Sequence, residues 1–348
     1  MKNVDARYEQ ESKESGLKYG IIEVTTFCQN RCPGCYMVQR NELTRKEMTL
    51  TQAIRVLDLC REYIGQELET MDILGGEPTT WSFLKEYIEE LLRRNIQPWI
   101  FTNMLSISEE LAKWLFEREV HITGKLNIAD FSNPEQLALQ ARMIGVGIKS
   151  AKLMQEKIEL LLKTGYRNPL LRLQNLIRKE NICLVPDYYR FCMKKEIGVD
   201  LEMMGSGEEI GPEYWEVAPT PQQIAEMVMA VQKVRAEFSL DPAEVLMPHI
   251  FGSCPFYDKG LYFAVDGHIR ACTNSTFRLA YVDDPSPIQM AFESQLISCR
   301  KKLCKEVVAE PCHSCDKWNK CRGGCRATTE GMGNPFGAYP LCPVPYLK

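Results

Sequence analysis

The chain has 348 residues, more than a single hydrophobic core usually organises, so we expect two domains. Charged residues make up 25% of it and the net charge is −4, a composition without the basic surface that a nucleic-acid partner requires. No stretch is long and apolar enough to span a membrane, and the polar segment 1–18 lacks the features of a secretory signal. We therefore expect a cytoplasmic protein.

Strand-like and helix-like stretches alternate over the first 210 residues. Buried strands are expected at 19–25, 71–78, 97–103, 120–128, 170–177 and 199–204, with helices at 82–94, 108–118, 149–164 and 186–198. Repeated βα units predict a parallel sheet with right-handed crossovers. Six units are too few to close an eight-stranded barrel, so the predicted fold class is α/β, a partial (β/α)6 barrel of the TIM type spanning 19–210.

A second domain is expected after a linker at 211–220, which is rich in proline and acidic residues. An amphipathic helix at 221–238 and a hairpin at 260–274, turning at Asp266-Gly267, would open this domain. Its end is rich in cysteine and glycine and poor in apolar periodicity, so it would need metal to fold. We therefore expect 221–348 to be a small metal-dependent domain.

Fifteen cysteines are distributed unevenly along the chain. Three of them, Cys28, Cys32 and Cys35, form a C-x3-C-x2-C motif, and nine lie between Cys254 and Cys342. A reducing compartment keeps thiols reduced, so dense cysteines there indicate metal binding or catalysis rather than disulfides. Both groups therefore predict metal sites.

The C-x3-C-x2-C motif directly follows the first predicted strand. It should lie at the carboxyl edge of the sheet, where parallel-sheet folds bind their ligands. Three thiolates can hold a 4Fe-4S cluster through three irons and leave the fourth iron open for another ligand. A zinc site completed by a remote residue, or cysteines packed in the core, are the alternatives.

This motif in this place resembles the radical S-adenosylmethionine (SAM) enzymes. The resemblance implies that Cys28, Cys32 and Cys35 hold a 4Fe-4S cluster whose open iron binds SAM. It also implies that an electron from the cluster cleaves SAM to methionine and a 5′-deoxyadenosyl radical, which abstracts a hydrogen atom from the substrate. The electron would come from an external donor of the flavodoxin or ferredoxin type.

A second motif supports the resemblance at the end of the second strand. It consists of Gly75, Gly76, Glu77 and Pro78. In the family such glycines let the backbone approach the methionine amino group of SAM, and Glu77 would be its anionic partner. The resemblance extends to weaker candidates for SAM contacts, namely Thr102, Asn103 and Tyr36, and to Asn127 and Glu202, for which a structural role is the alternative. The chain departs from the family pattern at Gly34, where an aromatic residue is usual.

The last third of the chain, about 219–348, resembles the seven-cysteine SPASM extension of radical SAM enzymes. By resemblance, one auxiliary cluster would take Cys254, Cys272 and Cys325, and the other would take Cys312, Cys315, Cys321 and Cys342. The implied cofactors are then three 4Fe-4S clusters and SAM, with a zinc ribbon as the alternative for this region. The first auxiliary cluster then lacks an assigned fourth ligand. The candidates for it are water, Asp258, Cys299, Cys304 or a substrate atom.

The resemblance implies a reaction class and leaves the substrate open. Oxidative modification or epimerisation of a peptide or protein side chain is the leading prediction. Dehydrogenation or epimerisation of a sugar-like small molecule is one alternative, and a non-catalytic iron-sulfur electron carrier is another. Cys183 or Cys192 would serve as hydrogen donor in an epimerase, although packing is the simpler role for both.

Overall fold

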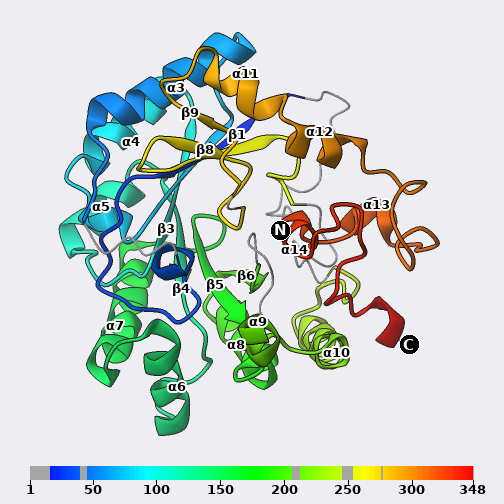
Figure 1. Cartoon of the computed structure of the whole chain (residues 1–348). Coiled ribbons are helices and arrows are strands. Elements are labelled where there is room, and N and C mark those ends of the chain that lie inside the picture. The colour runs from blue at the N-terminus through cyan, green and yellow to red at the C-terminus, as the bar shows by residue number, and fades with distance from the viewer. Residues whose placement is uncertain (1–15, 40–44, 206–211, 245–253, 276, 348) are drawn as a thin grey trace.

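A single nine-stranded sheet, in the order β6-β5-β4-β3-β2-β1-β7-β8-β9, organises the computed structural model (Figure 1). The structure describes residues 16–39, 45–205, 212–244, 254–275 and 277–347. Strands β1 to β6 run parallel, β7 joins β1 in parallel, and β8 and β9 continue antiparallel. The strands are β1 (Tyr19–Glu23), β2 (Thr70–Leu74), β3 (Gln97–Thr102), β4 (His121–Lys125), β5 (Leu171–Ile177), β6 (Gly198–Met203), β7 (Gly260–Phe263), β8 (His268–Arg270) and β9 (Ala280–Tyr281).

Helices connect the parallel strands and pack on the outer face of the sheet, as Figure 1 shows for α3 to α7. Those of the first part are α2 (Tyr36–Gln39), α3 (Leu50–Ile64), α4 (Leu84–Arg93), α5 (Glu109–Phe116), α6 (Pro134–Ile144), α7 (Ile148–Thr164) and α8 (Val185–Lys194). Those of the second part are α9 (Pro212–Val217), α10 (Pro221–Glu237), α11 (Pro287–Phe292), α12 (Gln295–Lys302), α13 (Trp318–Cys321) and α14 (Arg326–Gly331). The segments α12 to α14 lie across the sheet from α3 to α7 (Figure 1).

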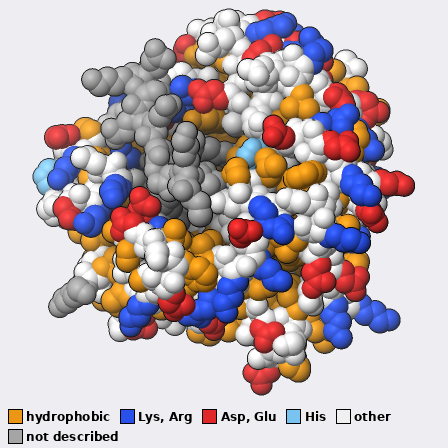
Figure 2. All heavy atoms as spheres, turned by 180° about the vertical axis from the view of Figure 1, so that it is seen from behind, with side chains coloured by type: hydrophobic (Ala, Val, Ile, Leu, Met, Phe, Trp, Pro, Cys, Tyr) orange, Lys and Arg blue, Asp and Glu red, His pale blue; other side chains and the backbone are white. Residues whose placement is uncertain are grey.

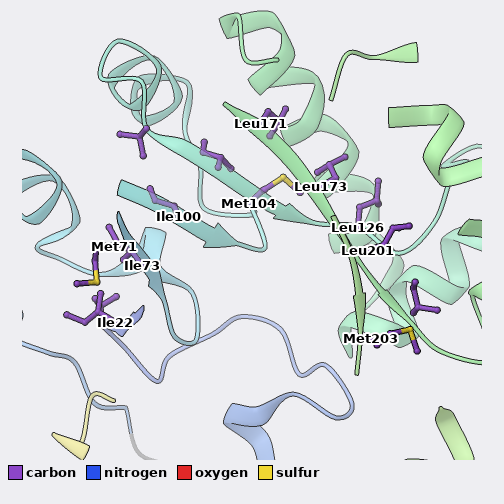
Figure 3. Close-up of a cluster of buried hydrophobic side chains, with 14 of the residues drawn as sticks. Ile22, Met71, Ile73, Ile100, Met104, Leu126, Leu171, Leu173, Leu201 and Met203 are labelled. Carbon is purple, nitrogen blue, oxygen red and sulfur yellow. The ribbon is translucent and has the colours of Figure 1, made fainter. Parts of the chain in front are cut away.

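Side chains alternate between the two faces of each parallel strand, as the twofold period of a strand requires. One set is apolar and buried beneath the helices, with Ile22, Ile73, Ile100, Leu173 and Leu201 among the side chains drawn in Figure 3. The other set points to the inner, concave face. In β5 the alternation is complete over all seven residues. The hydrophobic core therefore fixes the register, and with it the identity of every inward-facing side chain.

The partial (β/α)6 barrel predicted from the sequence is confirmed, and all six predicted strands are present. Ser108 caps α5, since its hydroxyl accepts a hydrogen bond from Leu111 N over 3.1 Å. The hairpin is also present, with Gly267 at a φ of 87° in its turn. Helix α6 was not predicted, although Asn133 caps it and Pro134 occupies its first turn.

Two features differ from the simple arrangement of barrel, linker and second domain. The predicted linker 211–220 contains helix α9, which packs inward through Tyr214. The hairpin strand β7 pairs directly with β1, so the sheet is continuous across the predicted boundary. Both follow from apolar side chains (Tyr214, Leu261 and Phe263) that the prediction did not place against the barrel. The polar segment 1–18 lies largely outside the described residues.

The surface carries charges of both signs in an interspersed pattern on the face drawn in Figure 2. Among the described residues, no helix combines the length and apolar character needed to cross a membrane.

Candidate active site

A cavity of about 380 Å³ opens at the carboxyl ends of the parallel strands. Its lining includes all three cysteines of the C-x3-C-x2-C motif, namely Cys28, Cys32 and Cys35. The same cavity is lined by three remote cysteines, Cys254, Cys272 and Cys325. The fold thus brings the first cysteine set and the first predicted auxiliary set onto one shared space, as the carboxyl edge of a parallel sheet favours.

The walls of this cavity are the inward-facing residues of the strands. From the strands, Trp99 and Phe101 supply aromatic surface, and five side chains supply charge. These charged strand side chains are Asp72, Lys125, Arg172, Asp200 and Glu202. Such a mixture suits a substrate with polar groups and an apolar part. Strand periodicity would have identified these positions from the sequence, since each stands next to a core residue of the same strand.

The loop after β1 is held in place by helix α6. The carbonyl of Ile144, the last residue of α6, accepts hydrogen bonds from Arg31 N (3.0 Å) and from the Cys32 thiol (3.6 Å). Gly145 follows with a φ of 64°, and a Cβ there would lie 1.9 Å from the Arg31 carbonyl oxygen. The helix that the sequence reading overlooked therefore supports the cysteine loop directly.

In the absence of metal, burial favours the protonated thiol at Cys28 and Cys32. Burial raises the pKa of Cys28 to about 11 and that of Cys32 to about 12. Lys125 partly opposes the effect at Cys32 because its positive charge favours the thiolate. Metals bind thiolates, so metal binding here must displace protons and supply the compensating positive charge.

Gly75 and Gly76 allow the loop after β2 to lie directly against the loop after β1. Gly76 N donates to the Thr25 carbonyl and Glu77 N donates to the Phe27 carbonyl, each over 2.7 Å. A Cβ on Gly76 would stand 2.1 Å from the Phe27 carbonyl oxygen, closer than any real contact. Both glycines also line the cavity, so their backbone is accessible to a ligand there.

Glu77 lies beneath this surface, with 0% of it exposed, and it does not line the cavity. Its Oε1 accepts hydrogen bonds from Thr79 N (3.0 Å), the Thr79 hydroxyl and the Thr102 hydroxyl (2.6 Å), and its Oε2 accepts one from Asn103 N (2.7 Å). Burial raises the pKa of Glu77, and these hydrogen bonds oppose the rise. The carboxylate thus joins the ends of β2 and β3, which is a positioning role. The contact of Glu77 with the SAM amino group stays a prediction. Pro78 begins the short 3₁₀ turn that Glu77 caps and is likewise buried away from the cavity.

We expect Glu77→Gln to lower the stability of the protein while leaving its iron content unchanged. A glutamine offers one acceptor oxygen, and its NH₂ group would face the N–H of Asn103 or the hydroxyls. Losing a hydrogen bond to a buried charge costs about 2 kcal/mol in the free energy of unfolding. Thermal unfolding of anaerobically reconstituted protein measures the stability. An iron assay measures the iron content, and a SAM titration measures the affinity for SAM.

Glu89→Gln provides the matched control for Glu77. Glu89 forms an exposed ion pair with Arg118 at 2.8 Å, and such pairs change stability by less than about 1 kcal/mol. A Glu77→Gln variant as stable as Glu89→Gln would contradict the positioning role. A loss of iron from Glu77→Gln would contradict the view that Glu77 is not a cluster ligand.

The remaining SAM candidates lie at the cavity. Thr102, Asn103 and Tyr36 all line it. The Asn103 side-chain amide approaches Cys28 Sγ at 3.5 Å, and the Tyr36 hydroxyl donates to the Gly75 carbonyl over 3.2 Å. Asn127 and Glu202 also line the cavity, and Asn127 Oδ1 additionally accepts a hydrogen bond from Leu176 N over 3.1 Å. Asn103 and Tyr36 therefore connect the cysteine loop to the ends of β3 and β2.

A second cavity, also of about 380 Å³, lies in the C-terminal region. Its lining includes Cys312, Cys315, Cys321 and Cys342, which are the four members of the second predicted auxiliary set. Within the described ranges, no three His, Cys, Asp or Glu side chains lie close enough to bind a single metal ion. Four cysteines are a ligand set that either a 4Fe-4S cluster or a zinc ion can use, so the second auxiliary cluster stays a prediction.

Other candidate residues lie away from the two cavities. Cys183 is exposed, and Cys192 is buried in the core behind β5 and β6, where burial raises its pKa to about 12. Neither lines a cavity described here, so the geometry does not favour hydrogen donation by either. Cys192 has the packing role, whereas packing is the wrong prediction for the exposed Cys183. Asp258, Cys299 and Cys304 likewise do not line the cavity that contains Cys254. The non-protein fourth ligand of the first auxiliary set stays a prediction, which a structure of the iron-loaded protein would decide.

Comparison with known proteins identifies the family. Residues 22–192 match the Radical SAM superfamily, so the chain contains a radical SAM domain. It is therefore an enzyme of the radical SAM class. Its cysteine-rich C-terminal region fits the SPASM extension predicted from the sequence. The radical SAM fold binds SAM and a 4Fe-4S cluster.

Relatives with curated names are distant. The chain is 25% identical over 202 residues to the tungsten-containing aldehyde ferredoxin oxidoreductase cofactor-modifying protein of Pyrococcus furiosus, a match that covers 57% of this chain and 53% of that protein. It thus spans about half of that relative. It is 22% identical over 342 residues to the PqqA peptide cyclase of Methylorubrum extorquens strain PA1, covering 92% of this chain and 84% of the cyclase.

Solved structures share the fold over almost the whole chain. The structure titled native anSMEcpe with bound AdoMet superimposes with a TM-score of 0.70 at 15% identity and covers 93% of both chains. Streptococcus suis SuiB bound to precursor peptide SuiA superimposes with a TM-score of 0.69 at 14% identity, covering 94% of this chain and 76% of SuiB. These likenesses extend the fold assignment beyond the barrel to the C-terminal region.

Proposed function

We propose that this enzyme oxidatively modifies or epimerises a side chain of a peptide or protein by hydrogen-atom abstraction. The observation that carries the proposal is the single cavity shared by the first cysteine set and Cys254, Cys272 and Cys325. A substrate in this space touches both the radical-forming site and the first auxiliary site. The names of the relatives support a peptide, because they include a peptide cyclase and a protein bound to its precursor peptide.

Cys28, Cys32 and Cys35 would hold the cluster that binds SAM, and the chemistry supplied there is one-electron cleavage of SAM, which generates the hydrogen-abstracting radical. The donor set suits this cluster, since three thiols line one cavity and leave room for a ligand beside them. Gly75 and Gly76 would present backbone to SAM at this place, and Tyr36 would present an aromatic edge. The electron would come from an external donor of the flavodoxin or ferredoxin type.

The cavity walls would orient the substrate. Asp200 and Glu202 on β6 offer carboxylates, and Lys125 and Arg172 on β4 and β5 offer cations. A peptide presents both amide groups and charged side chains, so it could use both signs of charge. Cys254, Cys272 and Cys325 would hold an auxiliary cluster on the far side of the substrate, where an electron from the product radical has a path out of the site.

The test combines the reconstituted enzyme, a reductant, SAM and the short peptides encoded beside this chain's gene, in deuterated water. We expect 5′-deoxyadenosine to form and one peptide to change mass. A loss of two hydrogens would indicate oxidation, and a gain of one deuterium would indicate epimerisation. Liquid chromatography with mass spectrometry measures both products.

Two results would count against the proposal in different ways. Formation of 5′-deoxyadenosine with a mass change only in added sugars would replace the peptide by a small molecule. No cleavage of SAM by fully iron-loaded, reduced enzyme would favour the electron-carrier alternative.

A further inference from the structure

The guanidinium of Arg326, at the start of α14, is buried between the two auxiliary cysteine sets without a carboxylate partner among the described residues. Only 3% of Arg326 is exposed. Its guanidinium donates to backbone carbonyls alone, those of Gly324 (3.4 Å), Pro335 (3.3 Å), Gly337 (3.1 Å) and Gly323. Carbonyl groups satisfy its N–H donors but do not neutralise its charge.

A nearby arginine shows how the fold treats a buried charge when a carboxylate is available. Arg300, 4% exposed, forms two hydrogen bonds of 2.8 Å with Glu330. Glu330 is the carboxylate near Arg326 as well, but both of its oxygens are engaged by Arg300. An unpaired buried cation is costly, so Arg326 indicates that an anion belongs beside it.

The neighbours of Arg326 identify where this anion would lie. Cys325 of the first auxiliary set precedes it in the chain and lines the first cavity together with Arg326. Gly323 and Gly324, whose carbonyls it binds, line the second cavity, and Cys312 of that cavity is close enough to interact with its charge. Arg326 therefore lies next to both sets. Thiolate-bound iron-sulfur clusters are anionic, so either set would supply the missing charge once loaded.

Tyr339 provides a second, independent observation at the same place. Its hydroxyl is buried and has no hydrogen-bond partner in the described part of the chain, and the residue is only 4% exposed. The ring lines the second cavity, and the hydroxyl lies near Cys325 and Cys342, one from each set. An unsatisfied buried hydroxyl is destabilising, which indicates that an acceptor is present in the functional protein.

We propose that Arg326 and Tyr339 form a bridge between the two auxiliary clusters that raises their reduction potentials. The inference rests on the proposed assignment of these clusters to the two cysteine sets. Reduction adds negative charge to a cluster, and a nearby cation or hydroxyl donor stabilises that added charge. The bridge acts on both clusters because it contacts both sets, and it favours the flow of an electron from the substrate radical into them.

The experiment measures cluster potentials rather than catalysis. It uses full-length protein in which Cys28, Cys32 and Cys35 are all alanine, so that only auxiliary clusters remain. Redox titrations, monitored by electron paramagnetic resonance, are run on this parent protein. They are also run on three variants of it, which carry Arg326→Gln, Arg326→Lys or Tyr339→Phe in addition. Arg326→Gln is expected to lower the reduction potential of both clusters. Arg326→Lys keeps the positive charge and should leave both potentials nearly unchanged. Tyr339→Phe should lower both potentials by less than Arg326→Gln does.

Lys317→Gln is the matched control, because it removes an equal charge near Cys315 from a solvent-exposed position. Solvent screens this charge, so no shift is expected. Unchanged potentials in both Arg326→Gln and Tyr339→Phe, with the iron retained, would overturn the inference. If Arg326→Gln fails to bind iron, Tyr339→Phe alone decides it by the same criterion. A parent that binds no iron would instead refute the cluster assignment itself.

Discussion

Simultaneous replacement of Cys28, Cys32 and Cys35 by alanine is expected to abolish the formation of 5′-deoxyadenosine. The iron content should fall from about twelve to about eight atoms per chain, because one of the three proposed four-iron clusters would lose all its protein ligands. The auxiliary clusters should persist, since their proposed ligands come from residues 254–342. Product analysis and an iron assay on anaerobically reconstituted protein measure the two effects.

Cys183→Ala is the appropriate control for the triple variant. Cys183 is exposed and lies outside both cavities, so its loss should leave the iron content and SAM cleavage unchanged. Continued cleavage of SAM by the triple variant would refute the assignment of these three cysteines. Stoichiometric zinc with little iron in the unmodified protein would refute the cluster assignment more broadly.

The sequence was sufficient for the barrel because its signals are local. Each strand of β1 to β6 contains apolar residues within a short segment, and the register then follows from burying one face. The motif residues Cys28, Gly75 and Asn103 all follow strand ends, so their convergence at one edge was predictable from the parallel order alone.

The sequence was insufficient where a role depends on contacts between distant segments. The pairing of β7 with β1 joins residues more than two hundred positions apart, and nothing local in either strand predicts it. The same holds for Glu77, whose carboxylate is engaged by Thr102 and Asn103 from another strand rather than exposed to the cavity. Family resemblance had suggested a ligand contact for Glu77, and only the three-dimensional arrangement revealed its positioning role.

The charged residues of the site illustrate an intermediate case. Lys125 and Arg172 were predictable as inward-facing, because each alternates with core residues of its strand. The proximity of Lys125 to Cys32 was not predictable, since it depends on the curvature of the sheet. The environment of Arg326 is harder still to predict. Arg326 ends the segment CRGGCR (321–326), and nothing in this segment indicates that its last arginine is buried between two cysteine sets without a carboxylate partner among the described residues.

Gly76→Ala is expected to have the second large effect, on the site that should bind SAM. The added methyl would lie 2.1 Å from the carbonyl oxygen of Phe27, which is backbone and cannot rotate away. The two loops must separate, breaking the hydrogen bonds Gly76 N to Thr25 O and Glu77 N to Phe27 O. Overpacking of this kind costs about 3 kcal/mol, and the displaced loop carries the first cysteine set.

The measurable consequences of Gly76→Ala are weaker SAM binding and a lower unfolding temperature. Gly16→Ala is the matched control, because no atom lies within 4 Å of a Cβ at that position and the same methyl is added without a clash. Titration of SAM into the reconstituted variants and thermal unfolding separate the two effects. Wild-type SAM affinity in Gly76→Ala would show that the close approach of the two loops is dispensable for the site. Equal stability of the two variants would show that the loop after β1 yields to the methyl group, because only a backbone shift in that loop can relieve the clash.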